Sequence, residues 1–403
     1  MSEATQILIP RGFRFGAAIA GIKPSGRPDL SLIVAGQPAS AAAAFTGNRV
    51  QAAPLHIDKE HLRAAGGRVR VVLINAGNAN CAAGQAGLDA AGASCVAAAQ
   101  VFACRPEEVF PSSTGIIGVP LPAEKIAAAL PALASRLGSE SDHFHQVAQA
   151  ILTTDTVEKT ACARIEIDGR EIRIAALCKG SGMIHPQLVP HATMLVYILT
   201  DALIEPAALQ CFLNSAIELS FNRISVDGDT STNDTVLLLA SGAAQIPIEP
   251  GNAEFQSALT RVCTSLARQI VADGEGIRHV VELRIDGAAS DADALRIAKS
   301  IAHSPLVKTA WAGSDPNWGR LVAAIGYSGA EIDPDRIDIH FGTLPICRNG
   351  GRAAEFDEAA AHAYLQQSEF SISIQLHQGS GSCVFWTTDL TADYVHINAD
   401  YST

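Results

Sequence analysis

Aromatic and charged residues are both scarce in this chain of 403 residues. Phe, Trp and Tyr together make up 5% of it and Asp, Glu, Lys and Arg 17%, whereas 48% of the residues are hydrophobic. The 29 basic side chains are outnumbered by 41 acidic ones and form no cluster, and the net charge is −12. Nucleic acids and anionic membrane surfaces attract proteins through basic patches. We therefore expect neither of them as a partner.

Paired cysteine motifs and long apolar segments are also absent. The nine cysteines are odd in number and include no C-x-x-C pair, so neither a disulfide framework nor a zinc site is predicted. The N-terminus carries Glu3, Arg11 and Arg14 rather than an apolar signal segment. No apolar run approaches the roughly 18 residues of a membrane span. These absences favour a reducing, cytoplasmic setting without a membrane partner.

The patterns that are present alternate between strand and helix along the chain. Apolar residues recur at helical spacing from Phe255 to Ile270, and alternating residues around Asp168-Gly169 predict a hairpin. Strands are predicted at 30–34, 69–74, 194–199, 236–239, 337–341, 371–376, 384–387 and 394–397, and helices at 87–102, 143–152, 205–219 and 358–367. The length and this succession suggest an α/β chain of two or three domains.

Thr193 stands directly before the predicted strand 194–199, in the stretch 179–202. A threonine there is most often only a β-branched residue that opens a strand. The alternative is that the chain is cut between Ala192 and Thr193. Thr193 would then be an N-terminal nucleophile whose own α-amine acts as its base.

Three further loops carry polar residues for which a functional role and a structural role can both be argued. A Thr114-Gly115 turn can present a hydroxyl and a backbone N–H in one direction, as an oxyanion site needs, although an ordinary turn is the commoner explanation. Residues 227–234, DGDTSTND, form either a cation loop or a turn, and we favour the turn because the EF-hand glutamate and spacing are missing. Glu275 lies between two glycines typical of a helix end, and packing does not explain it.

Other side chains near Thr193 offer competing chemistry. Cys178 is a second candidate nucleophile, but a cysteine beside a strand end is more often a buried structural residue. His185 and His191 are candidate bases. A free α-amine on Thr193 would make a histidine base unnecessary.

Short polar motifs follow one another in a fixed order along nearly the whole chain. They are NAGNAN from Asn75, STGIIG from Ser113, TTDT from Thr153, KGSGMI from Lys179, ATML from Ala192, GDTSTND from Gly228, DGEG from Asp273, LVKTA and DPNWGR within 306–320, and the C-terminal YVHINADYST. Each motif is weak alone, but their order and spacing together closely resemble the ornithine acetyltransferase family. The chain departs from the usual pattern in a longer segment between Met183 and Ala192 and in the GEGIRH run from Gly274.

This resemblance implies a glutamate N-acetyltransferase of arginine biosynthesis. Such an enzyme moves the acetyl group of N2-acetylornithine to glutamate through an ester on Thr193. Some members also use acetyl-CoA with glutamate, and no cofactor or metal is implied. The implied fold is α/β, with layered mixed β-sheets flanked by helices, like that of DmpA-type aminopeptidases. Autocatalytic cleavage would give chains 1–192 and 193–403, assembled as a heterotetramer with two of each.

The matching motifs also imply roles for individual residues. Thr114 and Gly115 would be the oxyanion donors in chain 1–192. Substrate would be held by Thr153, Lys179, Thr193, Glu275, Asn398 and Thr403. Lys179 suits a substrate carboxylate and Glu275 the ornithine ammonium; otherwise Lys179 is a solvated lysine on a glycine loop. The predicted strand 394–397 would anchor the C-terminal residues over the pocket.

Two other functional classes remain open from the sequence. One is a self-processing amidase or aminopeptidase of the same architecture that gives the acyl group to water. The other is a binding protein that keeps the fold without catalysis. The motif match along the chain argues against the first, and the presence of Thr193, Thr114 and Gly115 argues against the second.

Overall fold

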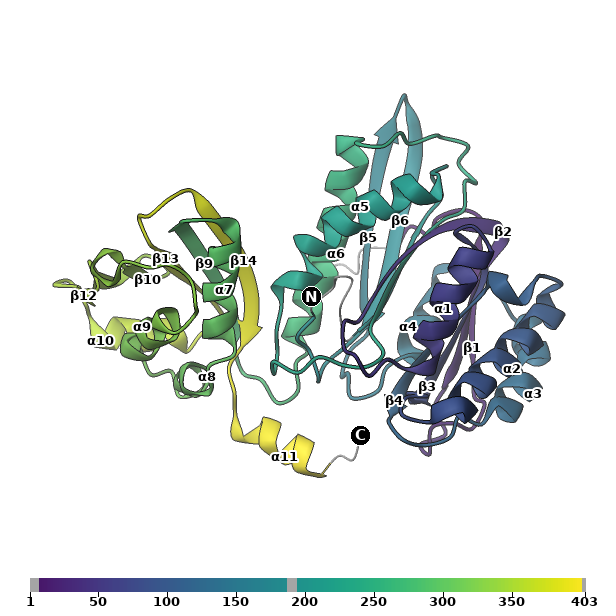
Figure 1. Cartoon of the computed structure of the whole chain (residues 1–403), viewed down its shortest axis with the longest axis horizontal. Coiled ribbons are helices and arrows are strands. Elements are labelled where there is room, and N and C mark those ends of the chain that lie inside the picture. Colours follow the sequence, from purple (N-terminus) through teal and green to yellow (C-terminus); the bar gives the residue numbers. More distant parts are fainter. Residues whose placement is uncertain (1–6, 187–193, 401–403) are drawn as a thin grey trace.

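The computed structural model describes residues 7–186 and 194–400, which form two separate β-sheets with helices packed against them (Figure 1). The expected α/β fold of layered mixed sheets flanked by helices is confirmed. The predicted cleavage site at Ala192 and Thr193 lies outside the described residues, and so does Thr403. Over the two described ranges, no helix is both long and apolar enough to cross a bilayer.

The first sheet contains, among the described residues, eight strands in the order β4-β3-β2-β8-β7-β6-β5, with β1 paired to β2. The strands are β1 Phe13–Ala18, β2 Leu30–Phe45, β3 Arg68–Asn78, β4 Val109–Ile116, β5 Lys159–Ile167, β6 Arg170–Lys179, β7 Leu195–Thr200 and β8 Thr235–Ala240. The β3–β4 and β7–β8 pairs are parallel. β5 and β6 form the predicted hairpin, and Asp168 and Gly169 turn with φ of 51° and 71°, as a two-residue hairpin loop requires.

The interior strand β7 explains why its sequence is a continuous apolar run. Every residue of it is buried, and alternate side chains enter two different cores. Val196 and Ile198 pack on the side of helices α5 and α6, whereas Leu195 and Tyr197 pack on the opposite face. A strand that is covered on both faces has no polar side to present.

The helices against this sheet are α1 Ala53–Ala64, α2 Gly84–Phe102, α3 Ala123–Ala134, α4 Ser141–Ala150, α5 Pro206–Glu218 and α6 Ala253–Ala272. α6 carries the predicted apolar stripe, and Phe255, Leu259 and Leu266 are all buried. Its first turn is capped by the Asn252 side chain, which accepts a hydrogen bond from the Phe255 N–H. The end of this helix leads into the DGEG motif, so its position determines where Glu275 lies.

The second sheet has the order β12-β11-β10-β13-β9-β14. Its strands are β9 Val280–Ala288, β10 Asp338–Phe341, β11 Leu344–Arg348, β12 Gly351–Arg352, β13 Glu369–Gln375 and β14 Gly381–Thr388, and its helices are α7 Asp291–Ala302, α8 Pro305–Ala312, α9 Trp318–Gly326 and α10 Glu358–Leu365. Short 3-10 helices lie at η1 Pro106–Glu108, η2 Phe221–Arg223 and η3 Pro334–Arg336. The Ser225 N–H donates to the Trp386 carbonyl at 3.0 Å and ties β14 to the loop that follows η2.

One predicted element is wrong. Residues 394–397 do not form a strand but lie in helix α11 Ala392–Asp400, which extends from the second sheet back towards the first (Figure 1). The Thr391 hydroxyl accepts a hydrogen bond from the Tyr394 N–H at 3.2 Å, as a helix cap does. The β-branched Val395 and Ile397 that suggested a strand point outward and are 59% and 40% exposed. Each other predicted strand and helix is present, although β2 continues to Phe45.

Candidate active site

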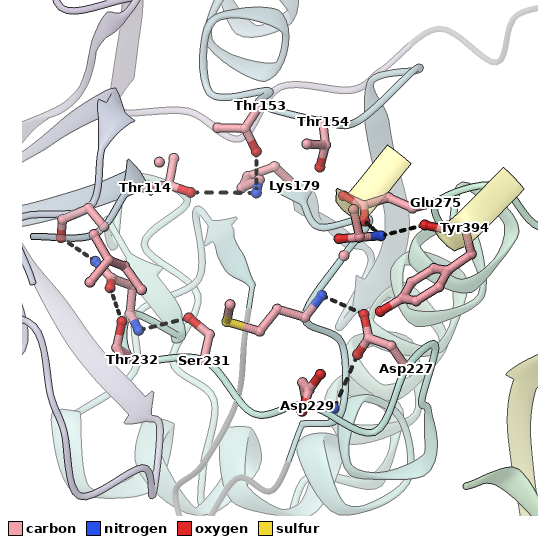
Figure 2. Close-up of a pocket in the computed structure, with 17 residues that line it drawn as sticks. Thr114, Thr153, Thr154, Lys179, Asp227, Asp229, Ser231, Thr232, Glu275 and Tyr394 are labelled. Carbon is pink, nitrogen blue, oxygen red and sulfur yellow. Dashed lines mark hydrogen bonds between the residues drawn. The ribbon is translucent and has the colours of Figure 1, made fainter. Parts of the chain in front are cut away.

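A polar pocket gathers most of the predicted site residues from distant parts of the chain (Figure 2). The described residues that line it include Thr114, Gly115, Thr153, Lys179, Glu275 and Asn398. The structure therefore brings together every predicted site residue that it describes. Ala192, Thr193 and Thr403 are outside the described residues, and their roles stay predictions.

Thr114 and Gly115 lie at the end of β4, where polar side chains from β3 and from the loop before β8 support the strand. Ser113 donates its hydroxyl to the Asn75 side-chain oxygen at 2.6 Å, and Asn233 donates its amide to the Ser113 carbonyl at 2.8 Å. Gly115 has φ of 131°, and a Cβ there would come within 2.3 Å of a backbone carbon of Gly77. Only glycine fits this close approach of β4 to β3, so the backbone at the predicted oxyanion site is tightly held.

Lys179 ends β6 and turns its amine towards two hydroxyl groups. Its Nζ donates to Thr153 Oγ1 at 2.8 Å and to Thr114 Oγ1 at 3.5 Å (Figure 2). The Asp155 carboxylate lies 3.6 Å from the same amine. Lys179 is only 8% exposed, so the interpretation of a solvated lysine on a glycine loop is wrong. We call Lys179, Thr153 and Thr114 the cationic side of the pocket, because a preorganised ammonium there suits a carboxylate.

Glu275 stands on another part of the pocket wall and is also only 8% exposed. Its Oε2 accepts a hydrogen bond from the Asn398 side-chain amide at 3.0 Å, so α11 contributes to this part of the site. Its carboxylate lies so close over Gly182 that a Cβ there would come within 2.4 Å of both oxygens. Burial raises the pKa of the neighbouring Tyr394 hydroxyl, and the charges of Asp227, Asp229 and Glu275 raise it further. We call Glu275, Asp227 and Asp229 the acidic side.

Asp227 is a functional candidate that the sequence reasoning missed. Its carboxylate accepts hydrogen bonds from the backbone N–H groups of Met183 at 2.6 Å, Ile184 at 2.8 Å and Asp229 at 3.1 Å. Met183 has φ of 57°, an uncommon conformation for a residue with a side chain, and Asp227 secures it. Burial raises the pKa of Asp227 to about 6, although the three N–H donors favour its ionised form. Its place at the start of the DGDTSTND run was the available signal.

The rest of that run behaves as the predicted turn. The Ser231 hydroxyl accepts a hydrogen bond from the Asn233 N–H at 3.1 Å, and the Asn233 amide donates to the Ala79 carbonyl at 2.6 Å. The Ser231 side chain therefore bonds neighbouring backbone, as in a turn, while Asn233 ties the run to the residue after β3. In the part of the chain that the structure describes, no group of three or more His, Cys, Asp or Glu side chains is arranged to hold a metal ion.

Cys178 and His185, the described candidates for a competing nucleophile and base, are both buried. Cys178 is fully buried, and burial raises the pKa of its thiol to about 12, so a thiolate does not form near neutral pH. His185 is buried, and its Nδ1 lies 3.1 Å from His303 Nε2. His191 lies outside the described residues.

The chain is similar to known proteins over nearly its whole length. A model of the ArgJ family matches residues 14–403. The arginine biosynthesis bifunctional protein ArgJ of Geobacter sulfurreducens is 44% identical over 397 residues, which cover 98% of this chain and 99% of that protein. The protein of the same name from Shouchella clausii is 46% identical over 397 residues, covering 98% of this chain and 95% of the relative.

Among solved structures, the arginine biosynthesis bifunctional protein ArgJ of Bacillus halodurans is similar, with 44% identity and a TM-score of 0.49. The match covers 51% of this chain and 98% of that one. The match to the family model extends over nearly the whole sequence, and the curated relatives are similar over nearly their full lengths. The chain therefore belongs to the ArgJ family.

Proposed function

We propose that this chain is a glutamate N-acetyltransferase that moves the acetyl group of N2-acetylornithine to glutamate, and that it also makes N-acetylglutamate from acetyl-CoA and glutamate. Its relatives at 44% and 46% identity are named arginine biosynthesis bifunctional proteins, which supports both reactions. The observation that carries the proposal is the pocket itself. Thr114, Gly115, Lys179 and Glu275 line it together, so oxyanion donors, a cation and an anion face one substrate.

The pocket suits an amino acid that bears a second amine. The Lys179 ammonium and the Thr153 hydroxyl would bind the α-carboxylate of the substrate. Glu275, steadied by Asn398, would bind the side-chain ammonium of ornithine. Thr403 would contribute further polar contacts. No cofactor is needed for this chemistry, and acetyl-CoA would enter only as a substrate.

The nucleophile in this proposal is Thr193, freed by cleavage of the bond to Ala192. The hydroxyl of Thr193 would attack the acetyl carbonyl while Thr114 and the Gly115 N–H stabilise the oxyanion. The C–N bond then breaks, and ornithine leaves with a proton passed from the α-amine, whose reference pKa is about 7.7–8.0. The amine of glutamate attacks the ester next, the C–O bond breaks and Thr193 regains its proton.

Cleavage would divide the protein into chains 1–192 and 193–403, and we propose a heterotetramer with two of each. The oxyanion residues would then belong to the first chain, and the nucleophile and Glu275 to the second. The nine cysteines, all of which lie in the described ranges, are free thiols. This supports the proposal of a reducing, cytoplasmic location.

The decisive experiment separates transfer from hydrolysis. Purified protein is incubated with N2-acetylornithine, with and without glutamate, and ornithine, acetate and N-acetylglutamate are measured. We expect about one equivalent of ornithine without glutamate and sustained turnover with it, as a ping-pong mechanism requires. Rapid acetate release without glutamate would identify an amidase instead.

The matched variant for this experiment is Thr193→Ala. It should remain a single uncut chain by mass spectrometry and transfer no acetyl group, whereas the wild type should give a fragment that begins at Thr193. An alanine variant that is still cut at this bond would exclude Thr193 as the nucleophile of cleavage.

A further inference from the structure

A buried ion cluster lies behind the pocket and joins the loops that form it. Lys159, the first residue of β5, has a side chain with 0% exposure. Its amine donates to the Asp155 carboxylate at 2.8 Å and to the Asp273 carboxylate at 2.5 Å. None of the three is among the described residues that line the pocket, so they act on substrate only through other residues.

Asp155 fixes the cationic side from behind. One of its carboxylate oxygens accepts from the Gly180 N–H at 2.6 Å, directly after Lys179. The other accepts from the Thr153 N–H at 3.1 Å and lies 3.6 Å from the Lys179 amine. One side chain therefore sets the backbone beside both groups proposed to bind the substrate carboxylate.

Asp273 connects this cluster to the loop that carries Glu275. Its carboxylate accepts hydrogen bonds from the Thr156 N–H at 3.0 Å and from the Thr156 hydroxyl. Its carbonyl accepts from the Ser181 hydroxyl at 2.6 Å, and the Glu275 N–H donates to the Ser181 carbonyl at 3.4 Å. The loop that presents Glu275 is thus tied to the loop that follows Lys179.

Asp155 and Lys159 both favour their charged forms in the folded chain. Burial alone would raise the pKa of Asp155, but the charges of Lys179 and Lys159 and the hydrogen bonds from Lys159 and Gly180 outweigh it and hold the pKa below its usual value. Burial likewise opposes the charged form of Lys159, yet Asp155 and Asp273 raise its pKa above the usual value. Charged hydrogen bonds in a buried setting have narrow geometric tolerance, so they hold the loops rigidly.

We propose that Asp155, Lys159 and Asp273 are positioning residues that fix the span between Lys179 and Glu275, and thereby make the site selective for the chain length of the diamino acid. This inference rests on the proposed function, because it assumes that the two sides of the pocket hold the two ends of the ornithine moiety. A substrate with one more methylene fits only if the distance between Lys179 and Glu275 increases. A pocket discriminates by about 10- to 200-fold against one methylene when its walls are rigid.

The test compares two identical substitutions at buried carboxylates. Asp155→Asn weakens the cluster. Asp201→Asn, the control, removes the charge of a fully buried aspartate that binds Arg11 at 2.6 Å. Asp201 follows β7, at the ends of β6 and β7 that are farther from Lys179. Transfer to glutamate is measured with N2-acetylornithine and with N2-acetyllysine. Asp155→Asn should raise KM for N2-acetylornithine by about tenfold and leave kcat within about threefold, because the hydrogen bonds of Asp155 go to Thr153, Lys159 and Gly180 rather than to the oxyanion residues. Its preference for ornithine over lysine should fall by about fivefold or more.

The control should behave differently, because Asp201 lies beyond the end of β7 opposite to the one that pairs with Lys179. Asp201→Asn should lower the melting temperature and keep both KM and the chain-length preference. Asp273→Asn is the second variant, since it acts on the cluster without facing Lys179, and it should reproduce the result if Asp155→Asn does not fold. The inference would be overturned if the folded cluster variants kept the wild-type KM for N2-acetylornithine and the wild-type preference for ornithine over lysine. It would also be overturned if Asp201→Asn changed these two quantities as much as the cluster variants do.

A binding measurement separates this inference from the proposed function. Calorimetric titration with L-ornithine and L-lysine should show the same loss of chain-length preference in the cluster variants. A wild-type protein that transfers no acetyl group would refute the proposed function, while the titration would still decide whether the cluster fixes the span. Equal preference in wild type and cluster variants would overturn the inference in either case.

Discussion

Lys179 is held by the end of a strand and by the loop after α4, whereas Glu275 is held by a loop and by a helix from the end of the chain. The Lys179 amine binds Thr153 and Thr114, which follow α4 and end β4. Glu275 follows α6 and takes its hydrogen bond from Asn398 on α11. Figure 2 shows the cationic side and the acidic side as separate groups around the pocket. The difference suggests two kinds of subsite. The one for the α-carboxylate, which all the amino-acid substrates share, is rigid, and the one for the substrate's side chain is formed where α11 meets the loop of Glu275.

The first way to test this contrast is Lys179→Met, which removes the shared contact. We expect kcat/KM to fall about 10- to 150-fold for N2-acetylornithine and for glutamate, because both carry an α-carboxylate and a charged hydrogen bond contributes about 1.5–3 kcal/mol. Steady-state kinetics with each substrate varied would measure it. A loss confined to one substrate would assign Lys179 to something other than the α-carboxylate.

Glu275→Gln should affect one substrate only. It removes the anion proposed for the ornithine ammonium, so kcat/KM for N2-acetylornithine should fall by about 10- to 50-fold. Glutamate has no side-chain cation, and its kcat/KM should stay the same or improve because its own carboxylate no longer meets Glu275. Asn398→Ala is the companion variant, since it leaves the charge and removes only the supporting hydrogen bond. If Glu275→Gln lowered kcat/KM equally for both substrates, Glu275 would not be specific for the ornithine ammonium, and the proposed difference between the two sides of the pocket would be wrong.

Removing residues 401–403 tests how far the acidic side depends on the chain end. These residues follow α11, which carries Tyr394 and Asn398 into the pocket. We expect about a tenfold loss in kcat/KM from the lost polar contacts. Cleavage before Thr193 should continue, as gel electrophoresis would show. Full activity of the shortened protein would mean that the tail has no contact with substrate.

The smallest expected effect on activity is that of Lys308→Met in the second sheet's lobe. The Lys308 amine is buried and donates to the Thr388 carbonyl at 2.5 Å and to hydroxyl groups, whereas Lys159 donates to two carboxylates. Burial therefore lowers the pKa of Lys308 to about 7, although Asp389 and Asp227 oppose the shift. Transfer by the variant should match the wild type.

Its stability, however, should respond to pH. Between pH 7 and the usual lysine pKa of about 10.4, the unfolded chain binds the proton and the folded one does not. The contribution of Lys308 is therefore fully present above that range and is lost as pH falls towards 7. The free energy of unfolding of the wild type, relative to Lys308→Met, should rise by up to about 1.4 kcal/mol per pH unit across this window. Parallel stability curves would show that the amine stays charged.

Sequence alone was enough for features that depend on neighbouring residues. The hairpin follows from residues that accept positive φ at Asp168-Gly169, and α6 from a repeating apolar stripe. The run 194–199 could be recognised as a strand because burial on both faces leaves a continuous apolar pattern. The order of short motifs was likewise sufficient to indicate the family, since no folding is needed to compare it.

Tertiary structure decided what depends on partners distant in sequence. Val395 and Ile397 favour a strand by propensity, but none of the described strands pairs with them and the Thr391 cap starts a helix instead. Asp227 and Asp155 look like ordinary loop aspartates until the fold brings them to the backbone of Met183 and Gly180. Whether a buried charge is stabilised depends on which side chains surround it. For that reason only the folded chain shows that Lys159 lies between two carboxylates while Lys308 donates to a carbonyl and to hydroxyl groups.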